Sequence, residues 1–303
     1  MAKKGYIFVL LTALVSGASI FVNKFGVKGI NPYIFTWSKN ILVVLFLFSL
    51  LILFKDLKTF KTLTNKQWLK LAAIGLFGGS IPFLLFFKGL AISPSSTAAL
   101  LHKSMFIFVT VLAVFFLKEK LNKGFIVAAI LLFAGNLFLL KLTNLSFGIP
   151  ELLILAAVLL WSTETIISKN ALKELPSRIV AFGRMFFGAI FILVFLAATG
   201  NITSFLELTV PQLGWIFLTS IFLLFYVTGW YAGLKYTPAS TAASILVLGS
   251  AITTTLSIAY AGTFNITEII GILLISSGAI TAIYSLRTKA SLLQAANEQK
   301  SCH

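Results

Sequence analysis

Charged residues are scarce in this chain of 303 residues: only 11% are charged, and Asp and Glu together number 8. Soluble domains carry about 25% charged residues, so the composition excludes a soluble globular monomer. The 1 cysteine, Cys302, lies in a polar tail and excludes a disulfide framework or a thiolate metal site. The sequence also lacks zinc spacings, phosphate loops, nucleophile elbows and haem signatures, which argues against an enzyme or a bound cofactor.

Apolar residues dominate the chain instead. They make up 59% of it, including 30 Phe, and the mean hydropathy is +1.02. A helix needs about 20 apolar residues to cross a bilayer, and continuous runs of that length favour helices over the strands of a barrel. The sequence therefore predicts an all-α polytopic membrane protein with ten transmembrane helices, at residues 6–24, 33–54, 68–90, 95–117, 124–140, 150–170, 177–198, 212–234, 239–260 and 268–286.

The positive charge is distributed in a way that predicts topology. The net charge is +16, from 24 Lys and Arg against 8 acids. A nucleic-acid binder would gather its cations on one soluble domain, whereas these lie in short gaps between apolar runs, so no nucleic-acid partner is expected. Most of them fall in alternate gaps, which predicts that both termini lie on the cytoplasmic side of the cell (inner) membrane, with the lipid bilayer as a partner.

An internal repeat is the most informative pattern in the sequence. Residues 87–99 align without a gap on residues 231–243. The repeat divides the chain into a first five-helix unit over residues 1–147 and a second over residues 148–287, followed by a cytoplasmic polar tail at residues 288–303. Because five is odd, the second unit is expected to enter the bilayer from the opposite side, which predicts two inverted repeats. Inverted halves can exchange conformations, so alternating access to a central site is the natural mechanism.

Several motifs give the chain a family resemblance. They are the two turns at residues 93–99 and 237–243, the stretch at residues 116–121 that closes the fourth span, and the basic residues Lys39 and Arg184 early in spans 2 and 7. With these features the chain resembles the ten-span EamA-type members of the drug/metabolite transporter superfamily. The resemblance implies export or uptake of small metabolites such as amino acids through a cavity lined mainly by spans 1 to 4 and 6 to 9.

Several charged residues lie within the predicted spans. A charge deep in a bilayer costs about 2.5 to 3.5 kcal/mol by insertion scales, so each should face the interior, find a partner or serve transport. Lys39 and Arg184 are placed near opposite mouths, where they either reach back to the interface or act at the substrate or a gate. Glu164 lies at the depth of Arg184, which predicts an ion pair that acts in gating or coupling, or else a static contact between helices.

His102 and Lys103 lie deep in the fourth span, whereas their repeat mates Leu246 and Val247 are apolar. A feature that the fold requires should recur in both halves, so this asymmetry favours a role in substrate binding. Lys103 is expected to face the cavity and, with Lys39, to form a cationic vestibule for a carboxylate or phosphate. His102 is either a proton-coupling group or a hydrogen-bonded structural histidine.

Five aromatic residues are candidates for stacking against a substrate: Trp37, Trp161, Tyr226, Trp230 and Tyr231. The alternative is that such residues anchor helices at the membrane interface.

Pro82 lies inside the third span near Gly78 and Gly79, which predicts a kink there. The glycines alternatively serve close helix contact.

The leading functional hypothesis is a secondary-active transporter of small metabolites. Its substrates would be amino acids or related compounds, anionic ones among them. A proton carried by Glu164 or His102 is one coupling mechanism, and exchange without a coupling ion is another. The alternatives are a passive channel or pore and an intramembrane enzyme or scaffold. The sequence leaves open whether the chain forms a homodimer.

Overall fold

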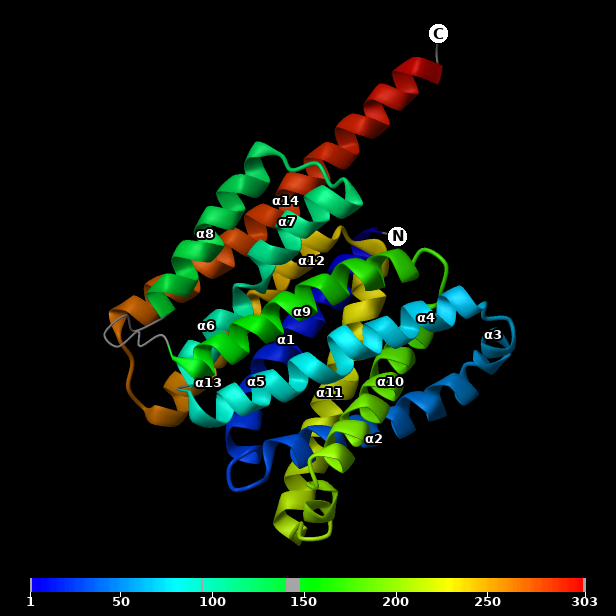
Figure 1. Ribbon diagram of the computed structural model, residues 1–303. Helices are drawn as coiled ribbons and strands as arrows, with labels where there is room; N and C mark the ends of the chain where they lie inside the picture. Colours follow the sequence, from blue (N-terminus) through cyan, green and yellow to red (C-terminus); the bar gives the residue numbers. More distant parts are fainter. Residues whose placement is uncertain (1, 94, 140–147, 302–303) are drawn as a thin grey trace.

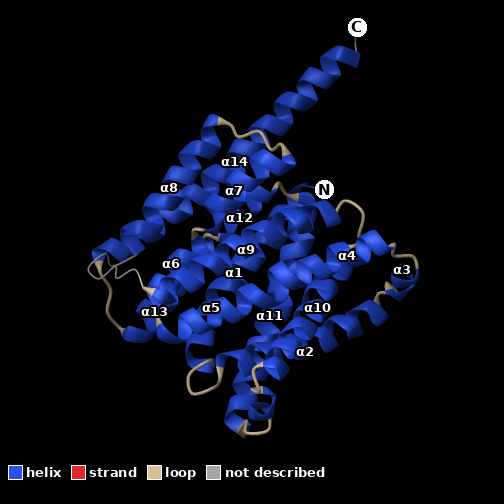
Figure 2. Cartoon of the chain, in the orientation of Figure 1, coloured by secondary structure: helices blue, strands red, loops and turns tan. Residues whose placement is uncertain are grey.

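The computed structural model describes residues 2–93, 95–139 and 148–301, and every regular element in these ranges is a helix (Figures 1 and 2). Pro94 and Cys302 lie outside the described residues. Two elements depart from α-helix, the π-helix η1 (Gly75–Ser80) and the 3₁₀-helix η3 (Ile202–Phe205). The α-helices are α1 (Ala2–Gly26), α2 (Pro32–Leu53), α3 (Leu57–Lys61), α4 (Asn65–Ile74), α5 (Ile81–Ile92), α6 (Ser95–Lys103), α7 (Met105–Leu117), α8 (Lys123–Leu139), α9 (Ile149–Ala171), α10 (Ser177–Ala198), α11 (Val210–Tyr236), α12 (Ala239–Leu246), α13 (Leu248–Ala261) and α14 (Ile266–Ser301).

The predicted fold class is confirmed: the chain is an all-helical, multi-pass membrane protein. Within the described ranges, nine helical segments are long and apolar enough to cross a bilayer. They are made from single helices or from consecutive ones, such as Asn65–Ile92, which contains α4, η1 and α5. The fifth predicted span corresponds to α8, an apolar helix of 17 residues, so the count of ten is approximate.

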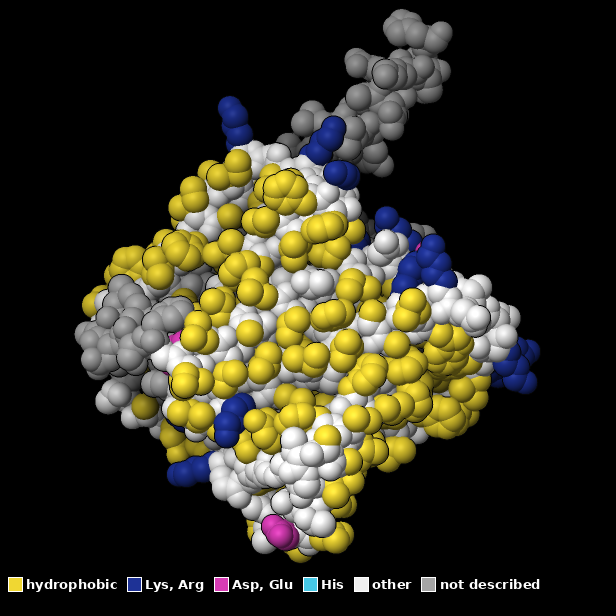
Figure 3. Space-filling view, viewed as in Figure 1, with side chains coloured by type: hydrophobic (Ala, Val, Ile, Leu, Met, Phe, Trp, Pro, Cys, Tyr) yellow, Lys and Arg dark blue, Asp and Glu magenta, His cyan; other side chains and the backbone are white. Residues whose placement is uncertain are grey.

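The helices cross the molecule between two ends. We call the end where α1 begins and where α9 and α11 finish the terminal face, and the opposite end the far face; both termini point toward the upper side of Figure 1. Gly5 of α1 lies against Thr237 after α11 on the terminal face, and Phe25 of α1 stacks on Trp215 of α11 toward the far face, with ring centroids 6.5 Å apart. In Figure 3 hydrophobic side chains cover most of the visible surface between the ends, while Lys and Arg lie mainly near its edges. This band matches the hydrocarbon of a bilayer.

Glycines allow the closest helix crossings. A Cβ on Gly188 of α10 would lie 2.5 Å from the carbonyl oxygen of Gly79 in η1, and a Cβ on Gly135 of α8 would lie 2.9 Å from the backbone nitrogen of Ile275 in α14. Backbones at this separation leave no room for a side chain, as is common where membrane helices pack through small residues. The α8–α14 pair stands apart from the cavity described below, because neither helix contributes to its lining.

Three of the membrane-crossing segments are irregular near their middle. In the third, the departure from α-helix is the π-helix η1, and Pro82 follows it in the first turn of α5, where its missing N–H costs no helical hydrogen bond. The irregularity therefore lies one turn before the predicted kink. The fourth segment breaks at Ser104, between α6 and α7, and the equivalent segment of the second half breaks at Val247, between α12 and α13.

Candidate functional site

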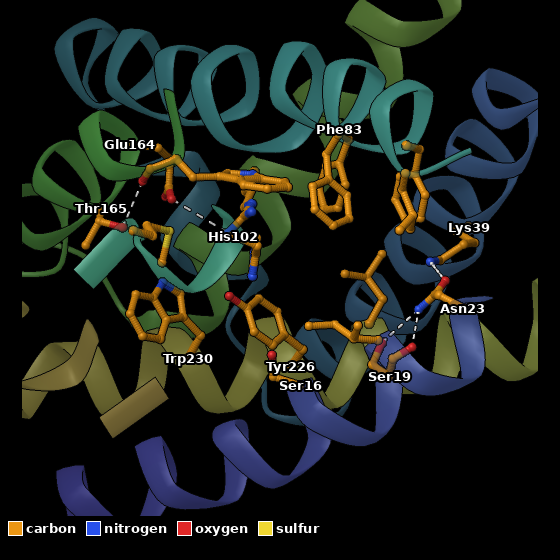
Figure 4. Close-up of a pocket in the computed structure, with 18 residues that line it drawn as sticks. Ser16, Ser19, Asn23, Lys39, Phe83, His102, Glu164, Thr165, Tyr226 and Trp230 are labelled. Carbon is orange, nitrogen blue, oxygen red and sulfur yellow. Dashed lines mark hydrogen bonds and ion pairs between the residues drawn. The ribbon is translucent and has the colours of Figure 1, made fainter. Parts of the chain in front are cut away.

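The described helices enclose a cavity with about 790 Å³ of empty space, its open mouth included. This size lies within the range of small-molecule sites, about 300 to 1,000 Å³. Eight helices contribute side chains to its wall (Figure 4). The lining residues are Ser16, Ser19, Ile20, Asn23, Lys39, Phe83, Phe86, Phe87, Leu90, His102, Met105, Trp161, Glu164, Thr165, Arg184, Leu223, Tyr226 and Trp230.

One end of the cavity is built around the ammonium of Lys39, which is 3% exposed. Its Nζ donates a hydrogen bond to Oδ1 of Asn23 at 2.7 Å and lies 4.7 Å and 4.9 Å from the ring centroids of Phe35 and Phe87. Asn23 in turn donates through Nδ2 to Oγ of Ser19 at 2.9 Å. No carboxylate in the described part of the chain lies within 4.0 Å of Lys39. Its charge is therefore held by an amide and two rings and is not neutralised.

The polar side chains of α1 that line this end were not among the predicted site residues, although their spacing in the sequence indicates them. Ser16, Ser19 and Asn23 occur at spacings of three and four, which places them on one stripe of an otherwise apolar helix. Such a stripe on a membrane helix marks the side that faces the protein interior rather than lipid.

The other end holds a buried ion pair, as the matching depths of the two residues predict. Arg184 Nη1 lies 3.7 Å from Oε2 of Glu164, and Arg184 Nη2 donates to the carbonyl of Gly78 at 3.0 Å. The Tyr231 hydroxyl donates to Oε1 of Glu164 at 2.6 Å, and the Ser168 hydroxyl donates to the same oxygen. The pair is thus electrically balanced, and its carboxylate is held by three elements, α9, α10 and α11.

Aromatic rings line the space between these two ends. The His102 ring lies edge-on to Trp161, with centroids 5.2 Å apart, and 5.3 Å from the ring of Phe86. Tyr226 and Trp230 stack with nearly parallel planes on the facing helix α11. Nδ1 of His102 has no hydrogen-bond partner within the described residues. The middle of the cavity is therefore mostly apolar, with one unpaired imidazole nitrogen.

Three of the predicted site residues lie outside the cavity lining. Lys103 points to α1, where its Nζ donates to Oγ of Ser16 at 3.0 Å, so it lies behind the wall. The Tyr231 ring lies behind Glu164, and Trp37 packs edge-on against Phe205 at 5.4 Å. The structure brings together Lys39, His102, Trp161, Glu164, Arg184, Tyr226 and Trp230.

Two contacts join helices on the terminal face, beyond the end of the cavity that holds Thr165. Lys169 follows the lining residue Thr165 by about one helical turn, and its Nζ donates to the carbonyls of Leu234 and Thr237, the latter at 2.7 Å. These carbonyls lie at the end of α11 and have no partner within that helix. Lys169 therefore joins α9 to α11 directly beyond the cavity.

Glu119 makes a second contact on this face. Lys118 adopts a left-handed conformation with φ of 56°, which ends α7 and turns Glu119 toward α12. The Glu119 carboxylate accepts hydrogen bonds from the backbone N–H groups of Ala239 and Ser240, at 2.7 Å and 3.2 Å, and from the Ser240 hydroxyl. These N–H groups belong to the first turn of α12, so Glu119 caps this helix from a distant part of the chain.

The described residues contain no group of three His, Cys, Asp or Glu side chains that could hold a metal ion. The polar groups that line the cavity include the Lys39 ammonium, the ion pair of Arg184 and Glu164, hydroxyls, an amide, an imidazole and indole N–H groups.

Comparison with known proteins identifies the family. The model of the EamA-like transporter family matches this chain twice, over residues 3–141 and 148–284. The chain belongs to the EamA-like transporter family. An uncharacterized transporter of Clostridium kluyveri is 30% identical over 316 residues, which cover 96% of both proteins. A general transporter role follows from this membership.

One solved structure, a crystal structure of a protein, superimposes on this EamA-like transporter with a TM-score of 0.75. The match covers 94% of this chain and 99% of the other, at 16% sequence identity. At that identity the likeness concerns the fold alone, and it supports the two-repeat helical architecture.

Proposed function

We propose that this EamA-like transporter is a secondary-active carrier of small metabolites with an anionic group, and that it works by alternating access. The observation that carries the proposal is the cavity itself. It has an unneutralised ammonium at one end and a buried ion pair at the other, and Lys169 joins α9 to the end of α11 on the terminal face beyond it. A buried charge that no protein carboxylate balances is a natural site for an anionic guest.

Two features support inverted repeats as the basis of the movement. The family model matches two consecutive segments of similar length. The fourth crossing segment breaks at Ser104, and its counterpart in the second half breaks at Val247, within one residue of the equivalent position in the repeat. Equivalent hinges in halves of opposite orientation would allow the cavity to open first to one face and then to the other.

The buried ion pair is the proposed coupling element. Arg184 and Glu164 come from α10 and α9, and the Tyr231 hydroxyl joins them to α11. Protonation of Glu164 would remove the charge that balances Arg184, so movement of these helices and proton binding would be linked. His102, with its unpartnered Nδ1, is the second candidate to carry a proton.

The proposal places the protein in the cell membrane with the terminal face on the cytoplasmic side. Counterflow in liposomes separates a carrier from the alternative, a passive channel. Unlabelled substrate on the trans side should accelerate uptake of labelled substrate by a carrier, whereas a pore gives no acceleration. An imposed proton gradient should drive accumulation, and the isosteric variant Glu164→Gln should abolish it. Accumulation that survives in this variant would remove Glu164 from the coupling mechanism.

A further inference from the structure

We propose that the cavity binds an aromatic carboxylate that has no ammonium group beside its carboxylate, and that it discriminates against the corresponding α-amino acid. This inference rests on the proposed function, since it names the substrate class of the same cavity. Three features of the cavity carry it: the partners of Lys39, the place of the acid, and the rings between the two ends.

Lys39 provides the site for the carboxylate. Its ammonium has three N–H donors, of which Asn23 Oδ1 takes one, and no described acid neutralises it. Lys103 lies behind the same wall, where it donates to Ser16, and it also has no carboxylate partner among the described residues. Both ammonium groups therefore favour a negative charge in the cavity, where the low dielectric strengthens the attraction.

An ammonium on the carbon next to that carboxylate would compete with Lys39 for the acceptors at this end. The oxygen of the Asn23 side chain already accepts from Lys39, and the faces of Phe35 and Phe87 already lie next to the same ammonium. Two positive charges would therefore share one set of acceptors. An ammonium buried without a partner pays its full desolvation cost, so the zwitterion should bind more weakly than the plain carboxylate.

Among the residues that the structure describes, Glu164 is the only acid in the cavity lining, and it lies at the opposite end and is already engaged. Figure 4 shows Glu164 and Thr165 on one side of the cavity and Lys39, Asn23 and Ser19 on the other. Glu164 accepts from the Tyr231 hydroxyl and faces Arg184, which balances its charge. A zwitterion with adjacent charges cannot reach both ends at once. The cavity lining thus carries a net positive charge that suits a monoanion.

The rings between the ends fit an aromatic body. Along α1 the lining runs from Ser16 to Asn23, about 10 Å at a rise of 1.5 Å per residue. The walls over this length include Phe83, Trp161 and Tyr226, which present both faces and edges for stacking. A phenyl ring on a short chain that ends in a carboxylate matches this length and polarity.

Binding of three probes to the purified full-length protein tests the inference. The probes share a phenyl ring and a two-carbon chain: 3-phenylpropionate, L-phenylalanine and 2-phenylethylamine. Titrations followed by tryptophan fluorescence, with thermal shift as a second measurement, should give at least tenfold tighter binding of 3-phenylpropionate than of L-phenylalanine and no binding of the amine. Equal or tighter binding of L-phenylalanine, or no binding of 3-phenylpropionate, would overturn the inference.

Variants at the anionic end sharpen the test. Lys39→Met should weaken 3-phenylpropionate at least tenfold and Lys39→Arg should retain it, while Lys88→Met, an exposed residue outside the cavity, should leave it unchanged. Asn23→Asp places a carboxylate next to Lys39, so it should lose 3-phenylpropionate and reverse the preference toward L-phenylalanine. This variant decides the question even if Lys39→Met does not fold. Unchanged selectivity in folded Asn23→Asp protein would show that Lys39 does not bind the carboxylate.

Counterflow of labelled 3-phenylpropionate then separates this inference from the proposed function. Binding in the predicted order without trans-acceleration by any solute would refute the carrier mechanism and leave the ligand class standing. Trans-acceleration by other solutes, with no binding of 3-phenylpropionate, would do the opposite.

Discussion

Removing the carboxylate of Glu119 would test whether the contact at the start of α12 keeps the cavity closed toward the terminal face. The carboxylate accepts two backbone N–H groups of the first turn and the Ser240 hydroxyl, and it comes from the segment that follows α7. An opening of this face that separates α12 from that segment would break all three hydrogen bonds at once. Glu119→Ala should therefore favour the open state.

The free-energy change expected for Glu119→Ala follows from the hydrogen bonds that the carboxylate makes to α12. Loss of an N-cap side chain costs about 0.5 to 2 kcal/mol, and a hydrogen bond to a charged group contributes about 1.5 to 3 kcal/mol. Because Glu119 is half-buried, water replaces part of the interaction, and we expect a net change of about 2 kcal/mol. This shift corresponds to an open population about 30-fold larger, since 1.4 kcal/mol is tenfold.

Cysteine accessibility in oriented vesicles measures this population. Thr165 lines the cavity next to the terminal-face contacts and is 1% exposed, so Thr165→Cys in a Cys302→Ser background reports opening. Labelling from the terminal side should accelerate about 30-fold in Glu119→Ala. Glu207→Ala, which removes an exposed carboxylate from the loop before α11, is the matched control and should have no effect. A lower melting temperature with unchanged labelling would refute the reasoning, because the cap would then stabilise α12 in every state.

Two further predictions concern stability. Gly79→Ala would place a Cβ 2.2 Å from the carbonyl oxygen of Arg184, so it should destabilise the protein by about 1 to 3 kcal/mol in denaturant titrations. The control Gly214→Ala, with open space around the new Cβ, should be nearly neutral. Equal effects of the two substitutions would contradict the packing argument. The hydrogen bond from Lys70, at 2.7 Å, lowers the pKa of Glu174. The wild type should therefore be more stable than Glu174→Gln, with the whole difference present above the ordinary carboxyl pKa. This difference should vanish as pH falls through the lowered pKa of Glu174. Thermal melts from neutral to acidic pH check this sign, and a gap that widens in acid would contradict it.

The membrane-crossing segments could be predicted because bilayer thickness sets the length of the apolar runs directly. The breaks within them could not. Neither Ser104 nor Val247 stands next to a proline, and the sequence around each is compatible with a continuous helix. The irregularity of the third segment was placed near Pro82, whereas the π-helix ends just before it, at Ser80. Helix breaks of this kind depend on tertiary contacts, which local sequence does not encode.

The charged residues of the site could be singled out because unpaired charges are expensive in a membrane, although the sequence left open whether Lys39 and Arg184 reach back to the interface; both line the cavity, as does Glu164. The orientation of neighbours was harder. His102 and Lys103 differ by about 100° on the helix, and only the position of α1 determines which one reaches the cavity. His102 lines it, and Lys103 hydrogen-bonds to Ser16 instead. Deciding which of the two residues lines the cavity required the position of α1, which the local sequence does not give.

The π-helix η1 also sets the rotation of α4 about the helix axis relative to α5. A π-helical turn carries one residue more than an α-helical turn, so deleting a single residue between Gly75 and Ser80 would allow the segment to anneal into regular α-helix. The annealing would rotate α4 by about 100° relative to α5. Lys70 would swing away from Glu174, and Leu71 would leave the buried face against Gly183. In this segment the number of residues matters as much as their identity, so a one-residue gap in a related sequence would signal a different arrangement of α4 against α10.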